Sequence, residues 1–407
     1  MKQVFFKHFL TFRYRLYQSF RDIFPLAMIY AWLGIFYNLF ISENSFLSET
    51  SQWSFYFQDW WLFMSQSLAN VLRFLTYFMS AYFVATFIKR NLEARKVNFF
   101  LPSLFGFLVT WLTVSRTGQG ADGSASPSQP AWLFLVLASL VIILAVRFWR
   151  WKSQTLIYSC LGLVLIVIYS LSNLLKNFPT FKPEYLMQMG FSEWLGNGPS
   201  QLWQVVLWSL LSSFLLIFGF VLPNVLLHPY TELTVVGDNL NVALSQATEK
   251  VPHLFTLYTV KDSFAMFGGV GLILALATAV LLESRKRSQS PYRRLALWTM
   301  IPIIFDQNLP FLLGLPVILQ PILLLPMIVT TLLAEGLGAL MLQLGWLDPA
   351  VYTVPNGTPS LLFGFLASNG DWRYLLITLV ILVLSVFIYL PFVKIALSKE
   401  VAHEKAA

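Results

Sequence analysis

The chain has 407 residues, of which 57% are hydrophobic and 11% are charged, and its net charge is +8. This composition excludes a water-soluble or disordered protein and indicates a polytopic membrane protein. The basic residues occur in short clusters between apolar runs, so we interpret them as topology signals and anionic-lipid contacts, and expect no nucleic-acid partner.

The first half of the sequence predicts a basic amphipathic segment followed by five spans. Residues 1–21 interleave lysine and arginine with apolar residues, which is typical of a segment on the cytoplasmic membrane surface. Residues 116–130 are rich in Gly, Ser, Gln and Pro and predict a disordered connector. Arg73 falls inside the second span, which must tilt, break or bury it. The predicted spans are 24–41, 60–88, 99–114, 131–146 and 156–175.

The second half cannot be read as simple crossings. Spans at 202–227 and 264–282 would place the basic cluster 285–294 outside, against the positive-inside rule. We therefore expect the polar stretch 228–261 or a neighbouring half-helix to enter the membrane and return without crossing it. A second re-entrant element is expected at 295–320, and further spans at 322–344 and 374–397. The predicted fold is an all-α polytopic membrane protein with nine or ten spans and both termini in the cytoplasm.

Residues 305–321 are the strongest candidate for a binding site. Four prolines near this segment each remove a backbone donor and oppose a regular helix: Pro302, Pro310, Pro316 and Pro321. Irregular backbone at membrane depth is tolerated where it is buried in protein or lines a polar cavity. The alternative is a kinked helix of the core.

Several motifs resemble those of one transporter family. They are F-G-G-V-G (267–271), G-L-P-V-I-L-Q-P (314–321) and V-P-N-G-T-P-S-L-L-F-G-F-L-A-S-N-G-D-W-R (354–373), with R-D-I-F-P-L (21–26) and Y-L-P-F (389–392). In this order the motifs resemble the enzyme IIC permeases of the bacterial sugar phosphotransferase system, in the lactose, cellobiose and chitobiose branch. The resemblance is strongest in the C-terminal half.

The resemblance implies a homodimer in the bacterial cell membrane, with about ten transmembrane helices and two re-entrant hairpins. It implies that a β-linked disaccharide is bound and carried inward. A separate cytoplasmic enzyme IIB, supplied by IIA, would then phosphorylate the sugar, because Cys160 of this chain falls in an apolar run. No cofactor and no metal are expected. Residues 1–200 would form a scaffold half with the dimerisation spans, and residues 201–407 the half with the substrate cavity.

The sequence departs from the family where the family's chemistry lies. The family motif N-E-P carries a glutamate that contacts the sugar, and this chain has Leu309 in that register. The family's His-Gly pair is absent, and the matching segment reads F-G-F-V-L-P (218–223). Phosphoryl transfer should therefore be weakened or absent, and we assign no catalytic residue. The alternative is compensation by Asp306 or His228.

Polar residues near the glycine and proline breaks could still hold a sugar. Each could instead serve its local backbone. The candidate sugar-binding residues are Asp306, Gln307, Asn308, Gln320, Asn356, Thr358 and His228.

Three further interpretations concern ionisable residues and partners. Asp371 is expected to be a structural or capping group. Arg73 and Glu335 lie deepest in apolar runs and should pair within the bundle, or alternatively serve a transport pathway. The main functional hypothesis is sugar transport, and the alternative is a transport-inactive sensor or membrane anchor. The basic segments 285–294 and 394–405 would dock either cytoplasmic partner.

Overall fold

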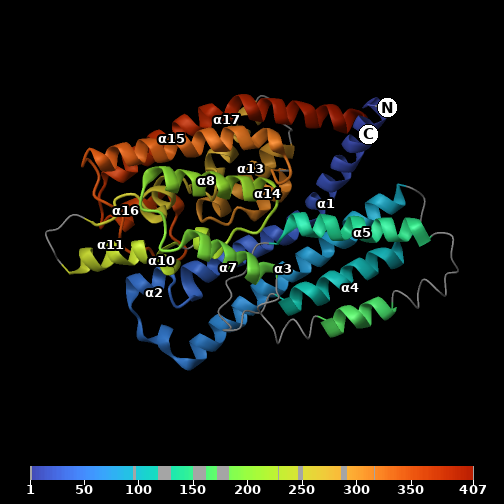
Figure 1. Cartoon of the computed structure of the whole chain (residues 1–407), viewed down its shortest axis with the longest axis horizontal. Coiled ribbons are helices and arrows are strands. Elements are labelled where there is room, and N and C mark those ends of the chain that lie inside the picture. The colour runs from blue at the N-terminus through green and yellow to red at the C-terminus, as the bar shows by residue number, and fades with distance from the viewer. Residues whose placement is uncertain are drawn as a thin grey trace. The chain divides into compact units, whose positions relative to one another are not determined.

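The computed structural model describes residues 2–94, 98–117, 130–149, 162–171, 183–227, 229–245, 251–285, 291–315 and 317–406. Helices make up all of its regular elements in these ranges, apart from one isolated bridge between Ser45 and Asn356 (Figure 1). Within the described residues, four helices are long and apolar enough to cross a membrane, and five shorter apolar helices accompany them. This confirms the predicted all-α membrane fold.

The described chain divides into two compact units that interleave along the sequence. The first comprises Met1–Tyr30, Leu68–Met187 and Gly219–Val221, and the second comprises Ala31–Ser67, Gln188–Phe218 and Leu222–Ala407. The predicted roles of residues 1–200 and 201–407 stay predictions.

The first unit is built on aromatic packing among three helices. It contains most of α1 (Lys2–Phe36) and α3 (Asp59–Glu93), together with α4 (Phe100–Thr117) and α5 (Trp132–Trp149). Phe20 of α1 stacks on Phe83 of α3 with ring centroids 4.8 Å apart, and Trp132 of α5 packs edge-on against both rings. The basic segment predicted at residues 1–21 is the N-terminal part of α1, so it continues directly into the first span.

An ion pair joins α1 and α3 in the same unit. The guanidinium of Arg90 donates to the carboxylate of Asp22 at 2.7 Å and to the side chain of Gln18 at 2.8 Å. A planar guanidinium suits such forked contacts with a carboxylate. The half-buried Arg73 lies earlier in α3, before Arg90.

The second unit combines long helices with many short ones. In it, α15 (Leu324–Gln343) packs on α8 (Leu202–Ile217) and α17 (Arg373–Ala406), and α12 (Ile273–Ser284) packs on α13 (Pro291–Ile304) and α17. Figure 1 shows α15 and α17 side by side in orange and red. The short elements are η1 (Tyr37–Ile41), α2 (Phe46–Ser51), η2 (Ser54–Phe57), α9 (Asn224–Leu227), α10 (Pro229–Glu232), α11 (Thr234–Leu244), η4 (Leu257–Asp262), α14 (Leu309–Gly314), η5 (Pro321–Leu323), η6 (Ser360–Leu362) and α16 (Phe363–Ala367); α7 (Pro183–Leu195) precedes α8.

Two predicted spans are shorter in the structure. The span expected at 264–282 is helical only from Ile273, because Gly268, Gly269 and Gly271 all have positive φ, which is incompatible with a right-handed helix. The span expected at 202–227 ends at Ile217, since the chain turns at Gly219 (φ 72°) and reaches Pro223 soon after. The interruption at residues 268–271 leaves non-helical backbone inside the second unit.

Asp371 has the capping role expected of it. Its carboxylate accepts hydrogen bonds from the backbone N–H of Asp348 at 3.1 Å and Arg373 at 3.0 Å, and from Nε of Arg373 at 2.7 Å. Burial alone would raise the pKa of Asp371, but these hydrogen bonds outweigh it and hold the pKa below its ordinary value. The turn before α17 is therefore fixed by an ionised carboxylate.

We expect Asp371→Asn to lower the free energy of unfolding by about 1 to 3 kcal/mol near neutral pH, because charged acceptors are lost. A carboxylate whose pKa is lowered in the folded state stabilises the protein at any pH above its ordinary pKa of about 4. This contribution disappears as the pH falls through the folded-state pKa. Thermal unfolding in detergent should thus show a gap between the two proteins that narrows in acid. The exposed Glu43→Gln is the control. A gap independent of pH would contradict the assignment.

Candidate functional site

The predicted break after residue 305 is present. Helix α13 ends at Ile304, and α14 is a short helix with a proline in its first turn. Between them Asp306 adopts a left-handed conformation with φ 57°, and the N–H of Gln307 bonds back to the carbonyl of Pro302 at 2.8 Å. A left-handed non-glycine residue is uncommon and marks a turn held by its surroundings. The side chains that follow are thereby directed by the turn rather than by a helix.

Asn308 is the best-defined candidate in this turn. The side chain is buried, and its Nδ2 donates to the carbonyl of Gly268 at 2.9 Å. Its Oδ1 has no hydrogen-bond partner among the described residues. A Cβ added at Gly269 would lie 2.0 Å from Nδ2, so the glycine-rich loop 267–271 has its shape because it packs on this amide. A buried acceptor without a donor is suited to a ligand hydroxyl.

A third segment joins this contact through Ser360, which the sequence reasoning missed. Its hydroxyl accepts from the N–H of Gly268 at 3.0 Å and donates to the carbonyl of Ile304 at 3.2 Å. The loop 267–271, the turn 304–308 and the residues that follow Pro359 therefore meet. A serine after T-P was the available signal, although its two partners are far away in the sequence.

The predicted neighbours of Asn308 lie on the same turn. Asp306 is exposed and within electrostatic range of Asp262. Gln307 is half-buried, and its Oε1 would lie 2.9 Å from a Cβ added at Gly34. The structure thus brings Asp306, Gln307 and Asn308 together.

The other candidates are more dispersed. Thr358 is buried and donates to the carbonyl of Pro355 at 2.8 Å, while Asn356 is exposed and its backbone pairs with residues 44–46. Gln320 is buried and immediately precedes η5; the N–H of its neighbour Leu319 bonds to the carbonyl of Ile217 at 2.6 Å. Among the described residues no hydrogen bond joins the side chains of Gln320 or Asn356 to the turn 306–308. His228, Cys160 and Pro316 lie outside the described residues.

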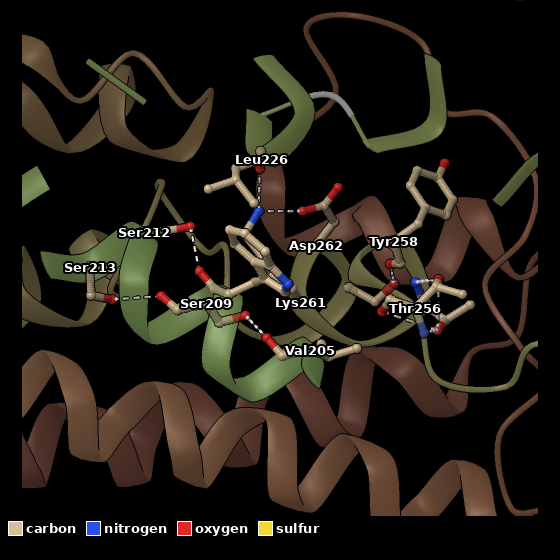
Figure 2. Close-up of polar contacts among 12 residues, drawn as sticks. Val205, Ser209, Ser212, Ser213, Leu226, Thr256, Tyr258, Lys261 and Asp262 are labelled. Carbon is tan, nitrogen blue, oxygen red and sulfur yellow. Dashed lines mark hydrogen bonds and ion pairs between the residues drawn. The ribbon is translucent and has the colours of Figure 1, made fainter. Parts of the chain in front are cut away.

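A buried ammonium was also missed. Lys261 belongs to the π-helix η4 and is 1% exposed, and its Nζ donates to the carbonyl of Leu226 at 2.6 Å and to Oδ1 of Asp262 at 3.0 Å. Figure 2 shows Nζ between these two oxygens, near the serines of α8. The side chains of Thr256 and Thr259 form a capping box that starts η4. The sequence signal was the adjacent Lys-Asp pair next to an apolar run.

Glu335 lies in α15 close to this pair. It is 0% exposed, and neither carboxyl oxygen forms a hydrogen bond of ordinary geometry with the described residues. Its charged neighbours are Lys261 and Asp262, and the hydroxyl of Ser209, which donates to Val205, is also near. Burying a carboxyl in this way is costly, so it is unusual without a function.

Comparisons with known proteins gave related transporters, although no family model matches the chain. The cellobiose-specific EIIC component of the PTS system from Lactococcus lactis is 37% identical over 132 residues, which is 32% of this chain and 26% of that protein. The lichenan permease IIC component of Bacillus subtilis is 32% identical over 36% of this chain and 32% of its own length. The galactose-specific EIIC component of Lactococcus lactis subsp. cremoris is 30% identical over 48% of this chain and 42% of its own length.

A solved structure is also similar. It is the transporter ChbC, the IIC component of the N,N'-diacetylchitobiose-specific phosphotransferase system, with 22% identity and a TM-score of 0.43 over 96% of this chain and 95% of that one. The matches to the three curated relatives each span less than half of the relative's length.

Proposed function

We propose that this chain, a relative of the enzyme IIC permeases of the cellobiose and lactose branch, binds a disaccharide and translocates it across the bacterial membrane. The observation that carries the proposal is Asn308, with its buried, unused acceptor where the loop 267–271, the turn 304–308 and the start of η6 meet. The names of the relatives support a sugar permease, and they give no support to the sensor or anchor alternative.

Sugar hydroxyls both donate and accept, so they suit the groups at this turn. Asn308 Oδ1 can accept a hydroxyl, and the exposed carboxyl of Asp306 can accept another. A hydrogen bond to the buried Asn308, which is shielded from water, would contribute about 1 to 3 kcal/mol. Gln307 and Gln320 are further candidates for the same ligand.

Phosphorylation-linked chemistry should be weak in this chain. The position that carries glutamate in the resembling family is Leu309, a buried residue at the start of α14. Loss of a positioned acid or base typically lowers a rate by about 10² to 10⁴. We infer that a separate enzyme IIB, and indirectly IIA, would act on the incoming sugar slowly or not at all.

The assembly in the membrane is also part of the proposal. Exposed apolar side chains on α17, such as Leu379 and Phe387, suit contact with lipid. A homodimer with both termini in the cytoplasm remains the expected arrangement. Cross-linking of the purified protein in lipid would test the dimer.

We expect Asn308→Ala and Gln320→Ala each to weaken sugar binding by about tenfold or more, because each removes amide groups from the site. The measurement is equilibrium binding of radiolabelled cellobiose, chitobiose and lactose to the purified full chain. Gln343→Ala is the matched control, since this amide is exposed at the end of α15.

Saturable binding that only the two site variants weaken would support the proposal. Binding that none of the variants changes would remove these residues from the site. No binding of any of the three sugars would overturn the permease proposal for this class of disaccharide.

A further inference from the structure

We propose that Glu335, together with the Lys261–Asp262 pair, forms a proton-binding site that is coupled to occupancy of the sugar site. This inference rests on the proposed function and extends it: the sugar's movement would be linked to protons instead of to phosphoryl transfer. The starting observation is a fully buried carboxyl that forms no hydrogen bond of ordinary geometry with the described residues, on a helix that packs against η4 and its buried ion pair.

The ion pair fixes one charge in this region. Lys261 Nζ is held by the carbonyl of Leu226 and by Asp262, and its side chain is 2% exposed while that of Asp262 is 11% exposed. These two acceptors hold the ammonium in place, and its electrostatic partners are Asp262 and Glu335.

The elements packed against α15 bring few other ionisable groups to Glu335. Helix α8 and η5 carry none. From η4 come Tyr258, Lys261 and Asp262, and from α17, in the part whose side chains are described, come Arg373, Tyr374, Tyr389 and Lys394. Of these, Tyr389 donates to the carbonyl of Gly271 and Tyr374 donates to that of Asp348. The groups that interact electrostatically with Glu335 are Lys261 and Asp262.

The same pair connects Glu335 to the sugar site. Asp262 interacts electrostatically with Asp306 as well as with Glu335, while Lys261 pairs with Asp262 and interacts with Glu335. Carboxylates that interact in this way cannot all ionise cheaply, so they share protons. A sugar hydroxyl that donates to Asp306 favours its ionised form, so the cluster passes a proton to water when sugar binds. No covalent bond forms or breaks, and the bulk solvent takes up the proton.

The geometry gives a reason for loss of the family's glutamate without loss of transport. A proton gradient could drive the sugar without any acid at position 309, because the acid that exchanges protons lies in α15. The proton would bind to and leave the carboxyl as the site changes its exposure.

The test uses the full-length protein in lipid nanodiscs and measures two quantities. Difference infrared spectroscopy on either side of neutral pH should show a protonated carboxyl band that is lost in Glu335→Gln and retained in Glu49→Gln, whose carboxyl is exposed. Addition of saturating cellobiose to a weakly buffered sample with a pH indicator should release protons from the wild-type protein. In Glu335→Gln this release should move to lower pH, because one negative charge has been removed from the cluster.

The outcomes separate the two proposals. Saturable cellobiose binding without any proton exchange would overturn the coupling and leave the permease intact. A carboxyl band that is absent from the wild-type protein, or unchanged by Glu335→Gln, would also overturn it. Failure of cellobiose to bind at any pH would overturn the proposed function and the coupling together.

Discussion

Replacing Lys261 with methionine should lower the free energy of unfolding by about 3 to 5 kcal/mol, since removing one partner of a buried ion pair leaves the other uncompensated. Asp262 would keep a buried carboxyl without its ammonium, and the carbonyl of Leu226 would lose the donor at 2.6 Å. Methionine has a similar length and fills the same space, so the loss reports the charge rather than the volume. Thermal unfolding of the purified protein in detergent measures it as a large fall in Tm.

A double substitution gives the matching control. Lys261→Met combined with Asp262→Leu removes both charges, and replacing a whole buried pair by apolar residues is often neutral. It should therefore recover most of the stability that Lys261→Met loses. Lys394→Met, at an exposed position in α17, should change stability by no more than about 0.5 kcal/mol. A double variant as unstable as the single one would show that the residues act through packing.

Gly269→Ala should cost about 3 kcal/mol and should also abolish sugar binding. The added Cβ would lie 2.0 Å from Nδ2 of Asn308, and the residue has φ 103°, which favours glycine. Either the loop or the amide must move, and the bond from Asn308 to Gly268 would break. Unfolding in detergent and cellobiose binding measure the two effects separately.

Gly336→Ala is the matched control for this change. Gly336 lies in the interior of α15, and a Cβ there would meet nothing within 4 Å. Alanine is the better helix former by about 1 kcal/mol, so the variant should be as stable as the wild type or slightly more stable. Equal losses at the two glycines would mean that the contact with Asn308 is unimportant.

The sequence predicted the elements whose cause is local. Proline content predicted the break between α13 and α14. The hydrophobic runs predicted both ends of α15 to within two residues and the starts of α3 and α17 to within one, but α3 and α17 extend beyond their predicted ends. The predicted span at 264–282 was wrong at its start, because its apolar composition outweighed the glycines that bend residues 268–272. Composition does not reveal that a loop is shaped by a distant side chain.

The site, like the fold, was predicted only where its cause is local in the sequence. Asp306, Gln307 and Asn308 adjoin one another in the sequence, so a single turn was enough to bring them together. Ser360 and Lys261 were missed because their partners are distant: Gly268 and Ile304 for the serine, Leu226 for the lysine. Which backbone carbonyl an ammonium reaches depends on tertiary packing, and a single sequence carries no record of it.

The parallel bridge between Ser45 and Asn356 has a consequence for how the protein is made. Asn356 exchanges backbone hydrogen bonds with Asn44 and Phe46, and a Cβ added at Gly357 would lie 2.8 Å from the backbone of Asn38. These contacts join an early part of the chain to a late one. Contacts between residues so far apart in sequence form slowly, because closing the long intervening loop costs conformational entropy. During synthesis residues 38–46 emerge long before residues 356 and 357, so these contacts can form only when translation is nearly complete. Membrane insertion factors and quality-control proteases would therefore meet this chain with its second unit still open.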